Sequence, residues 1–270
     1  MNILEKIVAD KKREVSASKE LYPVKLLEKS IYFDTRPVSL KEYLRREDKC
    51  GVIAEIKRKS PSRGVMKRSV NVEALSIGYM QAGASALSVL TDNAYFGGSK
   101  ADLTTARKFN FCPILRKDFV IDEYQIIEAK SIGADAVLLI ARILEREKAV
   151  QLARTAKQLG MEVLLEVHSR EEIDNKLFPE ADLVGVNNRD LDTLQTRVEL
   201  SFEIAPLLPS SICKVSESGI SDAKTILDLK RAGYHGFLIG ESFMKTAHPE
   251  RACARLISEI LKDTLRAGGN

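Results

Sequence analysis

Charged, amide and hydroxyl side chains end five short apolar runs of this chain, where a strand with only a structural role would seldom carry them. They are Glu55, Lys57, Lys117, Glu166, Asn187, Glu217 and Ser218. Burying an unpaired charge is costly, so five runs that end alike predict one shared active site. Its ammonium groups could donate protons and its carboxylates could accept them. Structural ion pairs at the end of a sheet would explain any one of these residues, but they explain the whole set poorly.

The spacing within each run places these side chains on one side of a strand. Side chains alternate along a strand, so Glu55 and Lys57 share a side, while Ala54 and Ile56 face the other way. In three later runs, an apolar residue or a glycine stands two positions before the polar residue that ends the run, so the two share a side of the strand. We therefore expect the polar residue to come last on the inner face, at the carboxyl end of each strand.

The elements that carry these residues alternate along the chain. Strands are predicted at residues 52–57, 86–90, 112–116, 136–140, 162–167, 183–187, 213–217 and 236–240. Helices are predicted at residues 72–82, 122–132, 146–159 and 223–232, each followed by a glycine. Strands that alternate with helices indicate a parallel sheet. Eight such units favour an α/β fold of the (β/α)8 TIM barrel type, with a doubly wound open sheet as the alternative.

The first 48 residues predict a helical extension without strands. Ile3, Leu4, Ile7 and Val8 recur at helical spacing, and a further short helix is expected at residues 40–46. No low-complexity linker divides the chain. We therefore expect one domain over residues 1–270, with the extension at residues 1–48 and the barrel at residues 49–270.

Three loops could hold an anionic ligand. Residues 60–64 form a tight loop that is either an ordinary turn or a ligand loop. Residues 217–222 and 240–242 open the helices after the seventh and eighth strands, where barrels often bind phosphate, although Ser218, Ser221 and Ser242 could simply cap these helices. Apolar residues near these loops could wall an aromatic ring. They are Pro61, Phe96, Phe119, Leu191 and Ile239.

Composition excludes several classes of protein. The net charge of +4 on 270 residues suits an anionic small molecule and does not indicate nucleic-acid binding. The four cysteines and three histidines lack the spacing of a metal site, and the cysteines suggest a reducing compartment, which we expect to be the cytoplasm. We expect no signal peptide and no membrane contact, because apolar runs of about six residues cannot span a bilayer. We expect a monomer or a weak homo-oligomer.

Several motifs, in order along nearly the whole chain, resemble the indole-3-glycerol-phosphate synthase family, a barrel enzyme family of tryptophan biosynthesis. They are the blocks 3–7 with Lys12, 53–57, 60–62 with Gly64, 115–119, 136–140, 165–168, 185–191 and 216–220. The resemblance implies closure of a pyrrole ring in 1-(2-carboxyphenylamino)-1-deoxyribulose 5-phosphate, with loss of carbon dioxide and water. It implies no cofactor and no metal.

The resemblance also implies residue roles. It assigns the catalytic centre to Glu55, Lys57, Lys117, Glu166, Asn187 and Ser218, with Glu217 beside them. Substrate contacts are expected at Ser60, Pro61, Phe96, Phe119, Arg189, Leu191 and Ile239. Backbone amides of Gly219, Gly240 and Glu241 are expected to hold phosphate. Our hypothesis is that Lys117 is the general acid of ring closure and that Lys57 holds the carboxylate and assists dehydration. Glu55, Glu166 or both would act as base and orienter.

One departure and three competing functions remain at this point. Some members of the family place a tryptophan of the N-terminal helix against the substrate ring, and this chain has no tryptophan. A phosphoribosylanthranilate isomerase would need a cysteine and an aspartate at strand ends, whereas Cys112 and Cys213 fall at strand starts. Such an isomerase would also leave Lys57, Lys117 and Glu166 unexplained. A thiamin-phosphate synthase is the other phosphate-binding barrel among the alternatives. A non-catalytic barrel that binds a phosphorylated ligand is the alternative outside enzyme chemistry.

Overall fold

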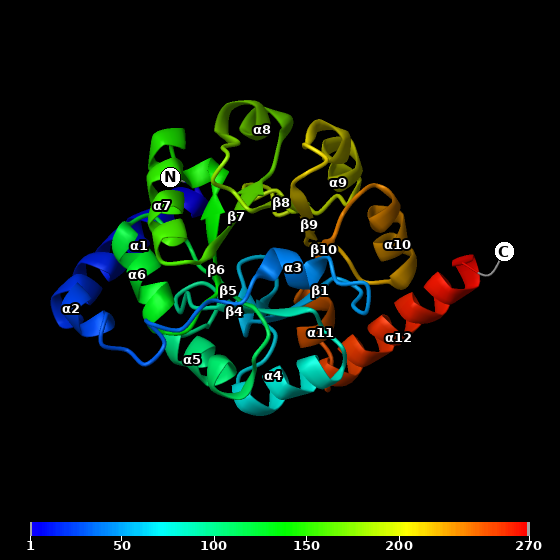
Figure 1. Cartoon of the computed structure of the whole chain (residues 1–270), viewed down its shortest axis with the longest axis horizontal. Coiled ribbons are helices and arrows are strands. Elements are labelled where there is room, and N and C mark those ends of the chain that lie inside the picture. The colour runs from blue at the N-terminus through cyan, green and yellow to red at the C-terminus, as the bar shows by residue number, and fades with distance from the viewer. Residues whose placement is uncertain (1, 269–270) are drawn as a thin grey trace.

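Eight parallel strands close into a barrel in the computed structural model, which describes residues 2–268 (Figure 1). The strands are β1 (Val52–Ile56), β4 (Ala86–Leu90), β5 (Ile114–Lys117), β6 (Ala136–Ile140), β7 (Glu162–Val167), β8 (Leu183–Asn187), β9 (Cys213–Glu217) and β10 (Gly236–Ile239). Each strand pairs with its neighbours in chain order, and β10 pairs with β1, with Ile53 opposite Leu238. The (β/α)8 barrel is therefore confirmed and the open sheet is wrong.

Helices surround the barrel, and all but the last two of them lie between consecutive barrel strands in the chain (Figure 1). They are α4 (Val72–Gln81), α5 (Lys100–Phe109), α6 (Glu123–Ser131), α7 (Arg146–Gln158), α8 (Arg170–Lys176), α9 (Glu199–Ile204), α10 (Ala223–Arg231), α11 (Glu241–Met244) and α12 (Pro249–Gly268), with 3-10 turns at Ala141–Ile143 and Ala205–Leu207. Polar side chains cap the amino ends of several of these helices. Asn71 accepts the N–H of Ala74 at α4, and Asp122 forms a capping box with Gln125 at α6.

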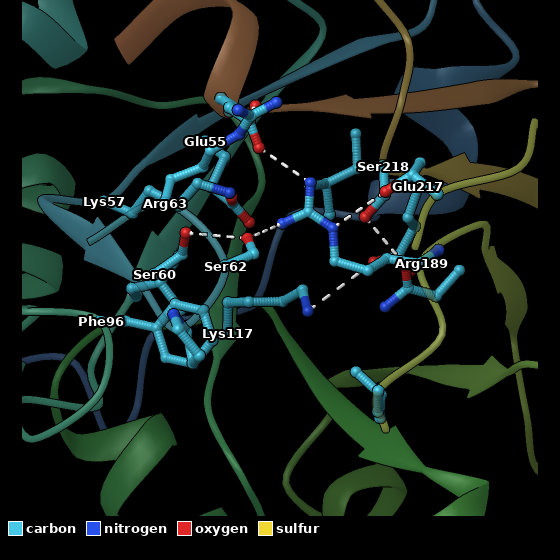
Figure 2. A pocket seen from close by; sticks show the side chains of 18 of the residues that line it. Glu55, Lys57, Ser60, Ser62, Arg63, Phe96, Lys117, Arg189, Glu217 and Ser218 are labelled. Carbon is cyan, nitrogen blue, oxygen red and sulfur yellow. Dashed lines mark hydrogen bonds and ion pairs between the residues drawn. The ribbon is translucent and has the colours of Figure 1, made fainter. Parts of the chain in front are cut away.

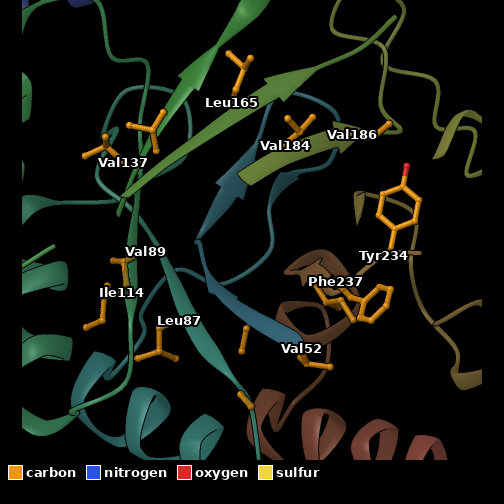
Figure 3. Packing of buried hydrophobic residues seen from close by; sticks show 14 of the residues in the cluster. Val52, Leu87, Val89, Ile114, Val137, Leu165, Val184, Val186, Tyr234 and Phe237 are labelled. Atoms are coloured by element: carbon orange, nitrogen blue, oxygen red, sulfur yellow. The ribbon is translucent and has the colours of Figure 1, made fainter. Parts of the chain in front are cut away.

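Alternate residues of the strands build two separate apolar layers. Ala54 and Ile56 face outward with Val89 and Phe237, into the layer between strands and helices (Figure 3). Ile53 and Leu164 belong instead to a smaller cluster inside the barrel. This alternation leaves the last inward position of a strand free for a polar side chain at the open end of the barrel.

The N-terminal extension is helical, as predicted, with α1 (Ile3–Leu21), α2 (Val24–Leu27) and α3 (Leu40–Leu44). Leu4 and Ile7 of α1 and Leu40 and Leu44 of α3 all join the cluster inside the barrel. Leu44 lies at the amino end, because a β-carbon on Gly236, the first residue of β10, would lie 2.9 Å from its Cδ1. The extension thus packs against both ends of the barrel.

A buried lysine fastens α1 to the carboxyl end of the barrel. Lys11 Nζ lies 3.0 Å from Asp92 Oδ2, 2.9 Å from Asp118 Oδ1 and 2.8 Å from Glu14 Oε2, and its side chain is 1% exposed. Burial alone would lower the pKa of Lys11, but Asp118 and Asp92 outweigh it and raise that pKa. The ammonium is therefore charged, and it holds α1 over the strand ends.

The cysteines and the helices add two smaller findings. Cys50, Cys112, Cys213 and Cys253 are buried free thiols, and they act as small packing residues of the interior. Across residues 2–268, no helix combines the length and the apolar character that crossing a membrane requires.

Candidate active site

A cavity of about 330 Å³ opens at the carboxyl ends of the strands (Figure 2). Every residue predicted for catalysis, substrate contact or phosphate binding lines it. They are Glu55, Lys57, Ser60, Pro61, Phe96, Lys117, Phe119, Glu166, Asn187, Arg189, Leu191, Glu217, Ser218, Gly219, Ile239, Gly240 and Glu241. The structure brings together side chains from positions 55 to 241 of the chain, and the roles assigned to them remain predictions.

Glu55 and Lys57 form a close pair at the end of β1. Lys57 Nζ lies 2.7 Å from Glu55 Oε1, and Ser88 Oγ donates to the other carboxylate oxygen at 3.4 Å. The Glu55 carboxylate fits only because residue 240 is a glycine, since a β-carbon there would lie 2.4 Å from Glu55 Oε1. The close approach of Gly240 thus sets where this carboxylate can lie.

Lys117 lies between two carboxylates from other strands. Its Nζ is 3.0 Å from Glu166 Oε2 and 3.7 Å from Glu217 Oε2. Burial would lower the pKa of Lys117, but Glu166, Glu217 and Glu55 outweigh that effect and raise it above the ordinary value. Lys117 therefore enters the cavity as an ammonium, able to give a proton only to a group whose basicity rises during reaction.

The carboxylate of Glu166 is held by donors on both oxygens. Lys117 contacts Oε2, while Asn187 Nδ2 donates to Oε1 at 3.2 Å and His168 Nε2 lies 3.2 Å from the same atom. Burial favours the neutral acid, but Lys117 first and His168 next reverse the balance and lower the pKa of Glu166. This side chain is ionised and has a fixed orientation.

Glu217 has the opposite character. It is 1% exposed, its Oε1 has no hydrogen-bond partner, and Gly185 leaves room for that oxygen because a β-carbon there would lie 2.2 Å away. Burial and the nearby charge of Glu166 raise the pKa of Glu217 to about 8. Two neighbouring carboxyl groups with divergent pKa values can divide acid and base roles between them.

The loop after β9 has an unusual backbone at the cavity wall. Ser218 and Gly219 have φ angles of 68° and 78°, in the left-handed region that residues other than glycine seldom occupy. Ser218 Oγ donates to Asn187 Oδ1 at 2.8 Å, and Asn188 Nδ2 donates to the Ser218 carbonyl at 3.0 Å. Strain of this kind persists where its surroundings enforce it, often at functional sites.

Arg63 and Arg189, which Figure 2 labels, both pair with Glu241 at the cavity mouth. Arg189 Nη2 lies 2.8 Å from Glu241 Oε2, and Arg63 Nε lies 2.8 Å from Oε1. Burial favours protonation, but the bond from Arg189 outweighs it and lowers the pKa of Glu241. Arg189 also donates to Ser62 Oγ, in the loop of the small hairpin β2 (Lys59–Ser60) and β3 (Gly64–Val65). The predicted tight loop is thus tied across the mouth.

An apolar wall faces these charges. The rings of Phe96 and Phe119 lie 6.0 Å apart between centroids, tilted by 40°. Ile3, Leu4 and Ile7 of α1 complete the wall, which the sequence had indicated only as helical spacing. Ile239 borders the cavity but also belongs to the layer beneath the helices.

Sequence reasoning did not propose several polar residues that line the cavity, among them Asp118, Thr196 and Lys245. It also missed His168 and Glu172, which lie behind Glu166. His168 follows β7 directly, and Glu172 is in the first turn of α8. Neither residue lines the cavity. Neither ends an apolar run as the predicted polar residues do, so the sequence does not distinguish them from charged surface residues. Within residues 2–268, no cluster of three or more histidine, cysteine, aspartate or glutamate side chains has the arrangement of a metal site.

Comparison with known families decides where this arrangement belongs. The sequence model described as indole-3-glycerol phosphate synthase matches residues 4–256. The chain belongs to the indole-3-glycerol phosphate synthase family. The enzyme of that name from Bacteroides thetaiotaomicron is 47% identical over 259 residues, which cover 96% of this chain and 99% of that protein. The one from Carboxydothermus hydrogenoformans is 43% identical over 263 residues, covering 94% and 99%.

The fold extends beyond this family. The 3-hexulose-6-phosphate synthase of Salmonella typhimurium superposes with a TM-score of 0.62 over 78% of this chain and 99% of that one, at 13% identity. Likeness at that identity reflects the shared barrel alone. Membership of the indole-3-glycerol phosphate synthase family, predicted from the motifs, is confirmed.

Proposed function

We propose that the protein is an indole-3-glycerol-phosphate synthase, a carboxy-lyase. It converts 1-(2-carboxyphenylamino)-1-deoxyribulose 5-phosphate into indole-3-glycerol phosphate, carbon dioxide and water. The observation that carries the proposal is the Lys117 ammonium between Glu166 and Glu217, inside the cavity of a chain from this family. The apolar wall around Phe96 and Phe119 suits the aromatic ring of the substrate.

Ring closure is assigned to Lys117. The aromatic carbon that bears the carboxylate bonds to the ribulose carbonyl carbon, and the carbonyl oxygen becomes a hydroxyl by taking a proton from Lys117 Nζ. A raised pKa does not prevent this step, because negative charge develops on the oxygen as the bond forms. Lys57, beside Glu55, holds the substrate carboxylate until it leaves as carbon dioxide.

Dehydration and proton removal complete the pyrrole ring. The new hydroxyl leaves as water with a proton from Lys57, and the carbon next to the nitrogen loses a proton to a carboxylate. We assign this proton to Glu166, because its lowered pKa leaves it in the basic form, whereas burial keeps Glu217 largely protonated at neutral pH. Glu55 orients Lys57.

The phosphate is assigned to the mouth beyond β9 and β10. Gly219, Gly240 and Glu241, whose backbone amides are proposed to hold the phosphate, line that part of the cavity, and Arg189 and Arg63 bring positive charge to it. Arginine forks suit phosphate oxygens, so Arg189 is proposed to contact the substrate.

The test is a direct assay of the purified protein with the carboxyphenylamino-deoxyribulose phosphate, followed by indole absorbance and fluorescence. The absence of tryptophan from the chain leaves little protein signal in the indole range. Turnover should appear with the wild-type protein and fall by at least about 10²-fold in Lys117→Ala, the lower end expected for a general acid. A folded wild-type protein that binds inorganic phosphate but gives no indole signal would sink the proposal and favour a non-catalytic phosphate-binding barrel.

A further inference from the structure

A histidine and a glutamate stand behind the proposed base, outside the cavity. His168 is almost fully enclosed, with its side chain 3% exposed. Its Nε2 lies 3.2 Å from Glu166 Oε1, and its Nδ1 lies 3.4 Å from Glu172 Oε2. The same Glu172 oxygen accepts the backbone N–H of His168 at 2.7 Å. One imidazole thus connects the carboxylate in the cavity to a carboxylate on α8.

We propose that His168 is a positioning residue for the reaction: clamped as an imidazolium between Glu166 and Glu172, it fixes the reacting carboxylate of Glu166 in one orientation. The proposal rests on the proposed function, in which Glu166 accepts a proton from the substrate. It adds Glu172 as the residue that holds His168.

The charges around His168 require the doubly protonated ring. Glu166 on β7 and Glu172 on α8 face its two nitrogens, and Lys117 on β5 and Glu217 on β9 lie beyond Glu166. A neutral imidazole has one N–H, so a lone pair would face one of the two carboxylates. Burial lowers the pKa of His168, but Glu166 and Glu172 outweigh it and raise that pKa to about 9.

The effect on Glu166 is orientation. Lys117 holds its Oε2 from the cavity side, and Asn187 and His168 hold its Oε1. Lys117 has its own role in proton transfer, so the fixed neighbours of this carboxylate are Asn187, which donates a hydrogen bond, and His168, whose Nε2 makes an ion-pair contact without a hydrogen bond. Groups behind a reacting side chain that lock its orientation commonly affect activity by about 10–100-fold at metal sites, and the same argument applies to a base.

Two substitutions at position 168 separate its contact with Glu166 from its contact with Glu172. His168→Gln can keep a donor near the Nε2 position, toward Glu166, and His168→Asn can keep one near the Nδ1 position, toward Glu172. We expect His168→Asn to lower kcat by about 10–100-fold with KM within about twofold, and His168→Gln to retain kcat within about fivefold. Thermal unfolding of both variants, followed by circular dichroism, serves as the control for folding.

A second measurement reads the charge of the ring without any turnover. The chain has three histidines, so ¹⁵N-histidine labelling gives few imidazole signals. The His168 signal is the one that disappears from the spectrum of His168→Gln. We expect an imidazolium at pH 8 in the wild-type protein and a lower His168 pKa in Glu172→Gln, which removes the charge and keeps an acceptor.

The outcomes separate the two proposals. A wild-type protein without synthase activity would overturn the proposed function and this role with it. An active enzyme in which His168→Asn and His168→Gln turn over like the wild type would overturn the role alone. So would a neutral His168 at pH 7 in the folded protein.

Discussion

Two clusters of buried charge meet at strand β5 and differ in how completely they are paired. The fastening cluster contains Lys11, Asp92, Arg116, Asp118 and Glu128, and the cavity cluster contains Glu55, Lys57, Lys117, Glu166 and Glu217. Arg116 and Lys117 are consecutive on β5, so strand alternation sends one charge to each cluster.

The fastening cluster is saturated. Arg116 Nη2 lies 3.1 Å from Asp118 Oδ2 and 2.8 Å from Glu128 Oε2, its Nη1 donates to the Gln125 carbonyl at 2.9 Å, and its Nε donates to Thr91 Oγ1 at 3.0 Å. Burial opposes ionisation of Asp118, but Arg116 and Lys11 lower its pKa to about 2. A cluster of this kind holds its charges in a single state near neutral pH.

The cavity cluster is left incomplete. It sets two lysines against three glutamates, Glu217 Oε1 has no partner, and the pKa of Glu217 is raised while that of Glu166 is lowered. Incomplete pairing keeps protons movable, which is what a reaction with several proton transfers needs. In this molecule the fully paired cluster holds α1 in place, and the partly paired cluster is the one proposed to carry out the reaction.

The sharpest test of this contrast is the replacement of Lys117 by methionine. We expect turnover to fall by about 10²–10⁴-fold, because the proposed proton donor is lost. The free energy of unfolding should change by less than about 2 kcal/mol, because Glu217 is already largely protonated and Glu166 keeps Asn187 and His168 beside it. Parallel assays of turnover and urea unfolding would measure both. A large loss of stability with little loss of turnover would reverse the distinction.

Lys11→Met should show the opposite pattern. Asp92 and Asp118 would remain buried without their ammonium partner, and breaking one side of a buried ion pair typically destabilises by about 3–5 kcal/mol. Urea unfolding measures the loss, and the neighbouring exposed Lys12→Met, expected within about 0.5 kcal/mol, is the matched control. Equal stability of the two variants would show that the ion pairs of Lys11 do not stabilise the packing of α1.

Glu217→Gln tests whether the unpaired carboxyl group of Glu217 makes the stability of the protein depend on pH. The pKa of Glu217 is raised from 4.5 to about 8, so the folded state holds this proton more tightly than the unfolded chain. Its contribution to stability is therefore present below pH 4.5 and is lost as the pH rises toward 8. The variant cannot ionise, so its melting temperature relative to the wild type should rise between pH 5 and pH 8. A difference that stays constant with pH would contradict the raised pKa.

The smallest effect is expected at the mouth. Arg63 is 64% exposed on its side chain, so its ion pair with Glu241 is worth no more than about 1 kcal/mol. Arg63→Ala should raise KM by less than about fivefold, and salt should reduce the effect. Arg189→Ala should raise it more, because that side chain is only 18% exposed. Equal KM values for Arg63→Ala and Arg189→Ala would contradict the expectation that the less exposed arginine contributes more to substrate binding.

Much of this molecule could be predicted from its sequence because strand periodicity is a local signal. All eight barrel strands were expected within two residues of their observed bounds, and the parity argument placed Glu55 and Lys57 on the inner side of β1. Helical spacing likewise indicated α1, and the family motifs indicated the residues that now line one cavity.

The features that the sequence did not predict depend on contacts between residues far apart in the chain, which produce no periodic pattern in the sequence. Lys11 resembles any surface lysine of an amphipathic helix until Asp92 and Asp118 surround it. His168 lies one residue beyond a strand, where a side chain can face solvent or a carboxylate equally well. The hairpin of β2 and β3 has two residues in each strand, too few for a period of two to show.

The pairing of β1 with β10 also governs how the protein can be made. During synthesis β1 emerges early, yet one of its edges has no partner until residue 239 has left the ribosome. Every intermediate length therefore presents an open strand edge, which can pair with another chain. Folding of the barrel is completed by its last strand, and a chain cut short before Gly236 would carry two open edges, at β1 and β9, in place of a closed ring.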